Sequence, residues 1–284
     1  MALIPPFFFD CVIAIGARDN AGAVSFTATG FLYGHPLPTP AAPPQTTYRV
    51  YLVTNRHVLT ARNNVVLRFN AFGGTPARTF DLSLTDSSGR PLFLCHSDPD
   101  VDIGAMFINA PALQQQGIQF SWFQGDKHVS TLVTAANDGV SEGSAVFLLG
   151  FPMGDAGKDH NFVVARQGCI ARMRDTVAGL SKHFLADVVV LPGNSGGPVV
   201  TRPEVVAIQG TKTPNRADLL GIVAGYIPYS DVAVSLQTKR PRVVFEENSG
   251  LAIVFPVEHI QAAVAQAEAH FFPPDQPQAP DSSS

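Results

Sequence analysis

The octapeptide Leu-Pro-Gly-Asn-Ser-Gly-Gly-Pro, whose serine is Ser195, places three glycines around one hydroxyl. Gly193, Gly196 and Gly197 allow positive φ angles and close approaches of other groups that a β carbon would hinder. The amides of Gly193, Asn194 and Ser195 can turn inward as a nest of donors, which suits a negatively charged oxygen. Ser195 is therefore a candidate nucleophile beside a candidate oxyanion hole. The alternative is a glycine-rich turn whose serine bonds its own backbone.

Two upstream segments supply the partners that a reactive serine needs. A run of β-forming residues precedes His57, which is expected at a strand end. An acidic turn runs into an apolar strand further on, and Asp102 is the last acid before it, placed to be buried. An imidazole can take up the serine proton near neutral pH, and an acid behind it fixes the tautomer. Asp98 and Asp100 lie close by and remain alternatives to Asp102.

The remaining sequence favours strands. The chain has 284 residues, is 45% hydrophobic and contains 24 glycines and 23 prolines, which suits many short strands joined by turns around one large or two modest cores. Val257, Ile260, Val264 and Ala267 recur at helical spacing after Pro256, which predicts one amphipathic helix there. An all-β fold with a C-terminal helix is the prediction.

These motifs together resemble the trypsin-like serine peptidases of chymotrypsin fold, nearest to the bacterial high-temperature-requirement (HtrA-like) branch. Besides the three segments above, the short matches, in the expected order, are Thr-Gly-Phe-Leu from Thr29, Gly-Phe-Pro-Met-Gly from Gly150, Gly-Cys-Ile from Gly168 and the segment from Ser249 to Pro256. The resemblance implies two Greek-key β-barrels packed together, and it favours Asp102 as the acid.

The expected domains follow from that resemblance. Residues 1–120 would form an N-terminal barrel that carries His57 and Asp102. Residues 121–272 would form a C-terminal barrel that carries Ser195, with the helix packed on it. A disordered tail is expected over 273–284, whose Pro, Gln, Asp and Ser cannot bury enough surface to order it. Other segments are expected to be irregular: a connection over 110–140, a proline-rich excursion over 35–45, and loops over 209–218 and 229–249.

The resemblance also implies a reaction. His57 would act as general base while Ser195 attacks a peptide carbonyl, with an acyl-enzyme intermediate and the oxyanion held by backbone amides. No acid occupies the position matched by Val189, so a small or medium aliphatic residue is expected before the cleaved bond. The strand around Val223 is expected to pair with an extended substrate. The candidate substrate-binding residues are Val189, Leu191, Val223, Ala224 and Gly225.

Two other classes of function use parts of the same pattern. A catalytically latent trypsin-like fold would act as a peptide-binding or scaffold module, although the complete set of His57, Asp102 and Ser195 counts against it. An ester hydrolase would use the same chemistry but usually carries its serine at a strand-to-helix elbow of an alternating α/β chain, and no such alternation is visible.

Partners and location can be predicted more coarsely. A protein or peptide is the expected substrate. The net charge of −4, with Lys and Arg scattered, argues against nucleic acid, and no apolar segment is long enough to span a membrane. The start lacks the basic region of an export signal, so a cytoplasmic location is expected. Neither a PDZ module nor an activation cleavage site is visible, so a partner protein or a homo-oligomer is expected to control activity.

No cofactor and no metal site are expected. Cys11, Cys95 and Cys169 lack the spacing of a disulfide framework or a zinc site and are interpreted as buried free thiols. The other histidines fall in no metal-ligand spacing and are expected at the surface. They are His35, His96, His128, His160, His183, His259 and His270.

Overall fold

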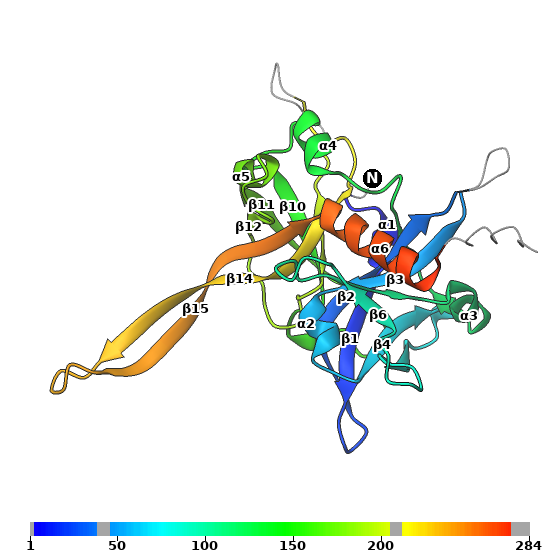
Figure 1. The fold of residues 1–284 in the computed structure, drawn as a ribbon, viewed down its shortest axis with the longest axis horizontal. Coiled ribbons are helices and arrows are strands. Elements are labelled where there is room, and N and C mark those ends of the chain that lie inside the picture. Colours follow the sequence, from blue (N-terminus) through cyan, green and yellow to red (C-terminus); the bar gives the residue numbers. More distant parts are fainter. Residues whose placement is uncertain (1–2, 39–45, 205–211, 274–284) are drawn as a thin grey trace, which may run out of the picture.

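A computed structural model describes residues 3–38, 46–204 and 212–273 (Figure 1). Most of the fold consists of strands, arranged as a curled half-barrel, a closed barrel and a C-terminal helix, so the all-β prediction is confirmed. Almost all of the predicted tail, and parts of the segments 35–45 and 209–218, lie outside the described residues.

The first half is a nine-stranded sheet in the order β5-β4-β1-β2-β3-β7-β6, with β8 paired to β4 and β9 paired to β2. The bounds are β1 (Val12–Arg18), β2 (Val24–Pro36), β3 (Tyr48–Thr54), β4 (Asn64–Ala71), β5 (Arg78–Ser83), β6 (Phe93–Cys95), β7 (Gly104–Phe107), β8 (Ile118–Gln119) and β9 (Phe123–Gln124). Aliphatic side chains such as Leu32, Leu52 and Leu67 fill the inside of the curl. Because β9 still pairs with β2, the first sheet draws on residues beyond 120, and the division at 120 stays a prediction.

The second half is a closed barrel in the order β10-β11-β12-β15-β14-β13. Its strands are β10 (Ala145–Gly150), β11 (Val164–Arg172), β12 (Phe184–Asp187), β13 (Pro198–Thr201), β14 (Leu219–Val234) and β15 (Pro241–Pro256). Leu148, Phe184 and Val254 lie in its core. A further apolar cluster joins the halves, with Phe31 from β2 and Ile222 from β14 as members. The two halves therefore share one continuous buried interface.

Short helices connect the strands. They are α1 (Pro6–Phe9), α2 (Arg56–Thr60), α3 (Ala110–Gln115), α4 (Leu132–Asn137) and α5 (Arg174–Val177), with 3-10 turns η1 (Phe72–Gly74) and η2 (Pro152–Gly154). None of the helices in the described part of the chain is long and apolar enough to cross a membrane.

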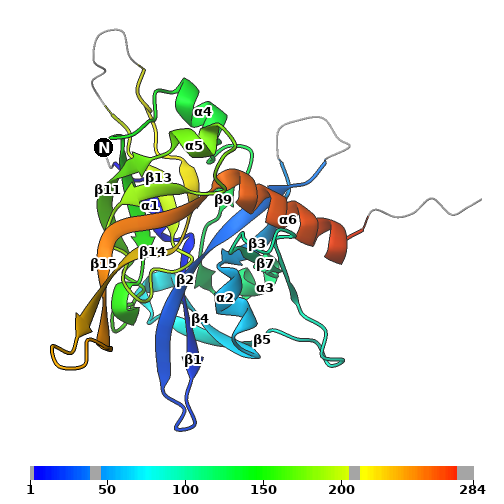
Figure 2. The same ribbon diagram turned by 60° about the vertical axis from the view of Figure 1, so that its left-hand side comes forward.

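The predicted C-terminal helix is α6 (Val257–Phe271), and it buries the apolar face that the spacing indicated. It packs against β14 and β15 of the barrel, as expected, but also against β6 and β7 of the first sheet (Figure 2). Glu268 of α6 accepts hydrogen bonds from Arg49 and from Tyr51 of β3, the latter at 2.6 Å. The helix thus ties the two halves together, which apolar periodicity alone does not show.

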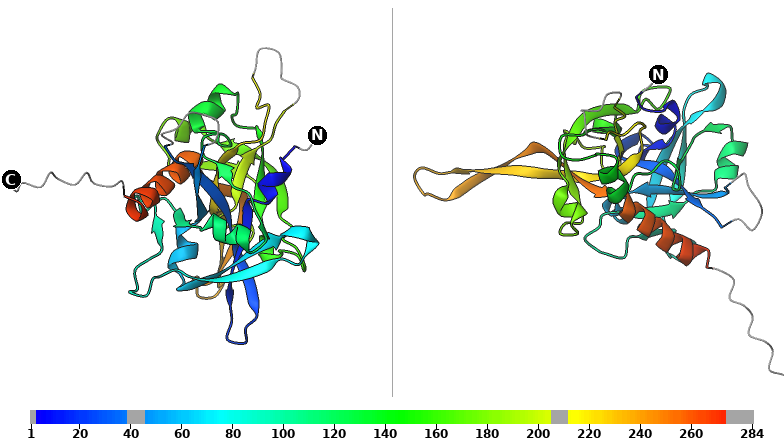
Figure 3. Two further views of the ribbon diagram at one scale, coloured as in Figure 1. Left: turned by 90° about the vertical axis from the view of Figure 1, so that its right-hand side faces the viewer. Right: turned by 90° about the horizontal axis from the view of Figure 1, so that it is seen from above.

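The last two strands are each 16 residues long and leave the barrel together as a two-stranded hairpin (Figures 1 and 3). We call residues 226–248 the arm. The two strands stay paired from Tyr229 opposite Glu247 to Ala233 opposite Val243. The prediction of loops over 229–249 is therefore wrong. Short runs of Val and Phe form cross-strand pairs there, while the prolines Pro228 and Pro241 lie at the two ends of this paired stretch and do not break it.

Candidate active site

The loop that carries Ser195, residues 191–197, needs its glycines for distinct reasons. Gly193 has φ of 98° and Gly196 has φ of 85°, values that favour glycine. A β carbon on Gly196 would also collide with Thr29 O and Thr54 Oγ1. Gly197 does not have a positive φ, but a β carbon there would lie only 2.5 Å from a backbone oxygen of β10. We call residues 191–197 the nucleophile loop.

Thr29 of β2 braces this loop from the first half of the molecule. Its amide donates to Ser195 O at 2.8 Å, and its hydroxyl donates to Gly193 O at 2.6 Å and accepts from Phe151 N at 3.1 Å. Thr54, three residues before His57, donates to Thr29 O at 2.7 Å. Thr29 is fully buried, so these contacts are shielded from water. The histidine segment and the nucleophile loop are therefore held by one shared threonine, whose role sequence reasoning missed.

Asn194 shapes the turn from inside. Its amide donates to Leu191 O at 2.9 Å, and its side-chain oxygen accepts from Leu191 N at 3.0 Å. The Asn194 amide is thus already used. The amides of Gly193 and Ser195 make no hydrogen bond within the described part of the chain. Of the three predicted oxyanion donors, Gly193 and Ser195 are the two that remain available.

His57 and Asp102 contact each other directly. His57 Nδ1 lies 2.6 Å from Asp102 Oδ2, and the His57 amide donates to Asp102 Oδ1 at 3.0 Å. His57 belongs to α2, just past β3, so its position is the first turn of a helix rather than a strand end. The Asp102 side chain is 27% exposed, half-buried where full burial was expected. The other two acids are engaged elsewhere, since Asp98 and Asp100 both pair with Lys182.

Arg56 holds the segment that leads to Asp102. One of its terminal guanidinium nitrogens donates to the carbonyl oxygens of His96 at 2.5 Å, Asp98 at 2.9 Å and Val101 at 3.3 Å. Asn55 adds a bond from its side-chain amide to Asp102 O at 2.8 Å. The two residues before His57 therefore position the acid behind it. Their only signal in the sequence is a polar pair directly after an apolar strand.

A second histidine pair lies behind this segment and corrects the expectation of surface histidines. His96 is 8% exposed, and its Nε2 lies 3.4 Å from Nδ1 of His259 on α6. The Asp98 amide donates to His96 Nδ1 at 3.1 Å, so that nitrogen carries no proton and Nε2–H points to His259. Burial lowers the pKa of both imidazoles. The pair is therefore built for two neutral rings.

The nucleophile loop lies beside the strand expected to bind substrate. Gly196 N donates to Val223 O and Val223 N donates to Gly197 O, each at 3.0 Å. Both backbone groups of Val223 are thus occupied, which leaves Ala224 and Gly225, both half-buried, as the residues there able to pair with a peptide. Before the loop, the Val189 side chain is 41% exposed and Leu191 is half-buried.

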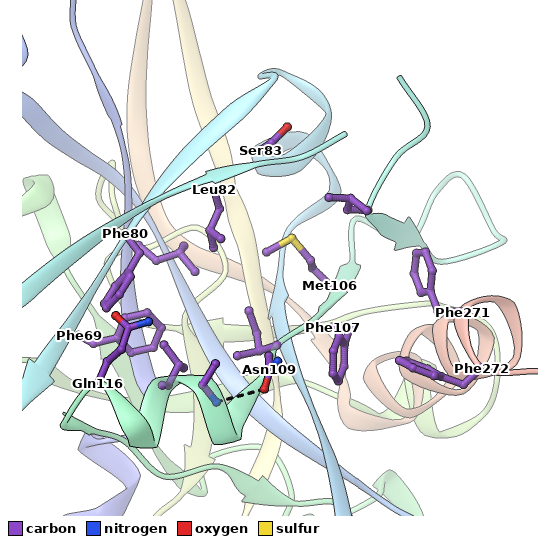
Figure 4. Close-up of a pocket in the computed structure, with 15 residues that line it drawn as sticks. Phe69, Phe80, Leu82, Ser83, Met106, Phe107, Asn109, Gln116, Phe271 and Phe272 are labelled. Carbon is purple, nitrogen blue, oxygen red and sulfur yellow. Dashed lines mark hydrogen bonds between the residues drawn. The ribbon is translucent and has the colours of Figure 1, made fainter. Parts of the chain in front are cut away.

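A cavity of about 640 Å³ lies elsewhere, between β4, β5, β7, α3 and the end of α6 (Figure 4). Apolar side chains such as Phe80, Met106 and Phe272 line it. None of its lining residues is a predicted catalytic or substrate-binding residue. The cavity therefore lies apart from every predicted site residue.

Residues 3–38, 46–204 and 212–273 contain no cluster of three or more His, Cys, Asp or Glu side chains that could hold a metal ion. All three cysteines are free, but only Cys11 is fully buried, while Cys95 and Cys169 are half-buried. Burial raises the pKa of the Cys11 thiol well above its usual range, which keeps it protonated.

Comparison with known proteins agrees with this geometry. The family model for the trypsin-like peptidase domain matches residues 28–208, which include His57, Asp102 and Ser195. No curated protein matches the chain significantly. The closed barrel, the curled half-barrel and the C-terminal helix are consistent with the double barrel of that family. Since the match covers more than half of the sequence, the chain belongs to the trypsin-like peptidase domain family.

Proposed function

We propose that this protein is a serine endopeptidase in which Ser195 is the nucleophile, His57 the general base and Asp102 the acid that orients it. The observation that carries the proposal is the double contact of Asp102 with His57, one to the ring at 2.6 Å and one to the amide at 3.0 Å. An acceptor at Nδ1 fixes the tautomer in which Nε2 is free to take a proton.

The proposed reaction has two stages, formation of an acyl-enzyme and its hydrolysis. His57 Nε2 takes the Ser195 proton as the hydroxyl oxygen attacks the peptide carbonyl, and the resulting oxyanion accepts hydrogen bonds from the amides of Gly193 and Ser195. The imidazolium returns its proton to the leaving amine, which leaves an acyl-enzyme. Water, deprotonated by the same imidazole, releases the acid product. Each oxyanion donor contributes about 3–4 kcal/mol to lowering the barrier.

Specificity is proposed for a small or medium aliphatic residue before the cleaved bond. Val189 and Leu191 are apolar, and a Lys or Arg side chain buried against them would lack a counter-ion, which is costly. Ala224 and Gly225 would pair with the backbone of the same substrate. A peptide library that differs only at this residue measures the preference, and cleavage after Lys or Arg would overturn this part of the proposal.

We also propose that a partner protein or oligomerisation controls the activity, and that the chain is nearest to the HtrA-like branch. The proposed control is supported by the continuity of β14, which runs from the candidate substrate-pairing residues Ala224 and Gly225 directly into the arm. Activity per molecule measured over a wide range of protein concentration tests it. A constant value, unchanged by added partners, would remove this control and leave the peptidase proposal intact.

Intact mass spectrometry after treatment with a serine-directed fluorophosphonate tests the nucleophile. We expect one adduct on the wild type and none on Ser195→Ala or His57→Ala, because the reagent needs an activated hydroxyl. Ser144→Ala is the matched control, since Ser144 lies outside the site, just before β10. It should label like the wild type.

The absence of an adduct on folded wild-type protein would contradict the proposal of an assembled nucleophile. The chain would then be a latent trypsin-like fold, and peptide binding without cleavage, measured by calorimetry, would become the function to pursue.

A further inference from the structure

The arm presents two strand edges that no other described strand covers. β15 pairs with β12 only from Leu251 to Val254, and β14 pairs with β13 only from Leu219 to Ile222. Over the arm, the two strands pair in a ladder only with each other among the residues that the structure describes. Unpaired strand edges of this kind are templates for another strand.

The arm also exposes apolar side chains on both faces. Cross-strand partners share a face, so Val232 and Val244 lie on one face, and Phe245 and Val243 lie on the other. Val243, Val244 and Phe245 are each at least half exposed. A two-stranded hairpin is marginally stable in water, and further strands are what stabilise it. The arm therefore has the properties of an unpaired interaction surface.

The distribution of charge on the arm indicates which of its two edges pairs with another strand, and which strand that is. β15 carries Arg242 near the tip of the arm and Glu246 and Glu247 nearer the barrel, and none of the three forms an ion pair within residues that the structure describes. Basic and acidic ends on one strand are complementary to the same strand running in the opposite direction. The outer stretch of β14, from Tyr229 to Val234, has a single charged residue, Asp231, and no such complement.

We propose that the arm is a self-association surface, in which β15 of one copy pairs antiparallel with β15 of a second copy about a two-fold axis at Val244. In this register Arg242 lies opposite Glu246 of the other copy, and Val243 lies opposite Phe245. When the two-fold axis is normal to the sheet, side chains opposite each other lie on the same face of the sheet. Arg242 and Glu246 meet this condition, and so do Val243 and Phe245. The two arms become one four-stranded sheet that covers both exposed β15 edges.

The proposal is independent of the peptidase function, because it uses no residue of the nucleophile loop or of the His57 and Asp102 pair. The substrate-pairing residues Ala224 and Gly225 lie on β14 and stay free in this arrangement. Activity and association can therefore fail separately.

Sedimentation velocity over a concentration series tests the register through two charge reversals. The wild type is expected to show a monomer–dimer equilibrium. Arg242→Glu alone and Glu246→Arg alone each place two pairs of like charges across the axis, and each should weaken the dimer about tenfold or more. An equal mixture of the two single variants restores both opposite-charge pairs and should associate about as well as the wild type.

Lys127→Glu, an exposed site away from the arm, is the matched control for net charge and should leave association unchanged. A wild type that stays monomeric up to its solubility limit would overturn the proposal. So would a dimer that both single reversals leave unaffected, since its contacts would lie elsewhere on the molecule.

A cross-link gives a second readout. Val244→Cys lies opposite itself across the proposed axis, where cross-strand Cα atoms are about 4.5–5.5 Å apart, a distance that a disulfide can span. Mild oxidation should therefore yield a covalent dimer. Val232→Cys lies on the same face but one strand further from the axis, and it should remain monomeric, as should the wild type with its native thiols. Equal cross-linking of both variants, or of neither, would overturn the register.

Discussion

The nucleophile loop and the arm are both attached to β14, and they are stabilised in opposite ways. At its inner end β14 is fixed by two hydrogen bonds between Val223 and the loop, in a region buried between the two halves. At its outer end the same strand has one neighbour and exposed side chains on both faces. The inner end of the strand is therefore held in place by contacts that other elements make with it, and not by the strand itself.

The largest effect should come from the acid behind His57. Asp102→Asn keeps the shape but lets an amide donate toward Nδ1, which favours the wrong tautomer, so kcat on a peptide substrate should fall by about 10⁴-fold. Asp100→Asn is the matched control, because Asp100 pairs with Lys182 and should change kcat little. A comparable loss in both variants would mean that the choice among the acids was wrong.

The brace on the inner end of β14 can be broken through Thr29. Thr29→Val keeps the volume but removes the hydroxyl that bonds Gly193 O and Phe151 N, leaving both groups buried and unpaired. The free energy of unfolding in urea should fall by about 1–3 kcal/mol, and kcat should fall with it as the loop shifts. Thr79→Val, exposed on β5 and without a side-chain hydrogen bond among the described residues, should change neither. An unaffected Thr29→Val enzyme would show that the loop keeps its geometry unaided.

Acid should weaken the contact between the Asp102 segment and α6. Because burial lowers the pKa of His96 and His259, the unfolded chain binds protons before the folded chain does. Stability is therefore present above about pH 6.5 and declines as pH falls from there toward the folded pKa values. Urea midpoints at about pH 7.5 and about pH 5.5 measure the decline, which His96→Asn should reduce and the exposed His270→Asn should not. Identical declines in all three proteins would exclude the pair as its source.

The smallest effect on stability should come from removing the arm. Joining Pro228 to Asn248, which face each other across the hairpin, by a two-residue Asn-Gly turn deletes the exposed part. Exposed residues contribute little to folding, so the free energy of unfolding should change by less than about 0.5 kcal/mol while self-association is lost. A large loss of stability would mean that the arm supports the barrel and that the outer end of β14 is not merely an exposed extension.

Local motifs allowed the candidate site residues to be predicted, and the structure brings two of them, His57 and Asp102, into contact. A reactive serine needs glycine around it, and a histidine or aspartate at the end of a strand is visible in a short window, so His57, Asp102 and Ser195 could be selected from sequence. The contacts that support them could not. Thr29 and Arg56 act through backbone oxygens far away in the chain, and only the fold brings those oxygens close.

The arm and the outer contacts of α6 escaped prediction for a different reason. Residues 229–249 mix charges with short apolar runs and lack the alternation of a half-buried strand, because both of their faces are exposed. Glu268 occupies an ordinary helical position, and its partners Arg49 and Tyr51 lie on the other half of the molecule. The cytoplasmic location and the division of the chain at residue 120 stay predictions.

The bridge made by α6 sets an order of events during synthesis. The segment that leads to Asp102 rests on α6 through His259 and through Gln266, which accepts from Ser97 N at 2.9 Å. The ribosome makes α6 only after both barrels, so a growing chain can carry His57 and Ser195 before the acid has its full support. The Asp102 segment therefore gains its last supporting contacts only after residues 257–271 have been made.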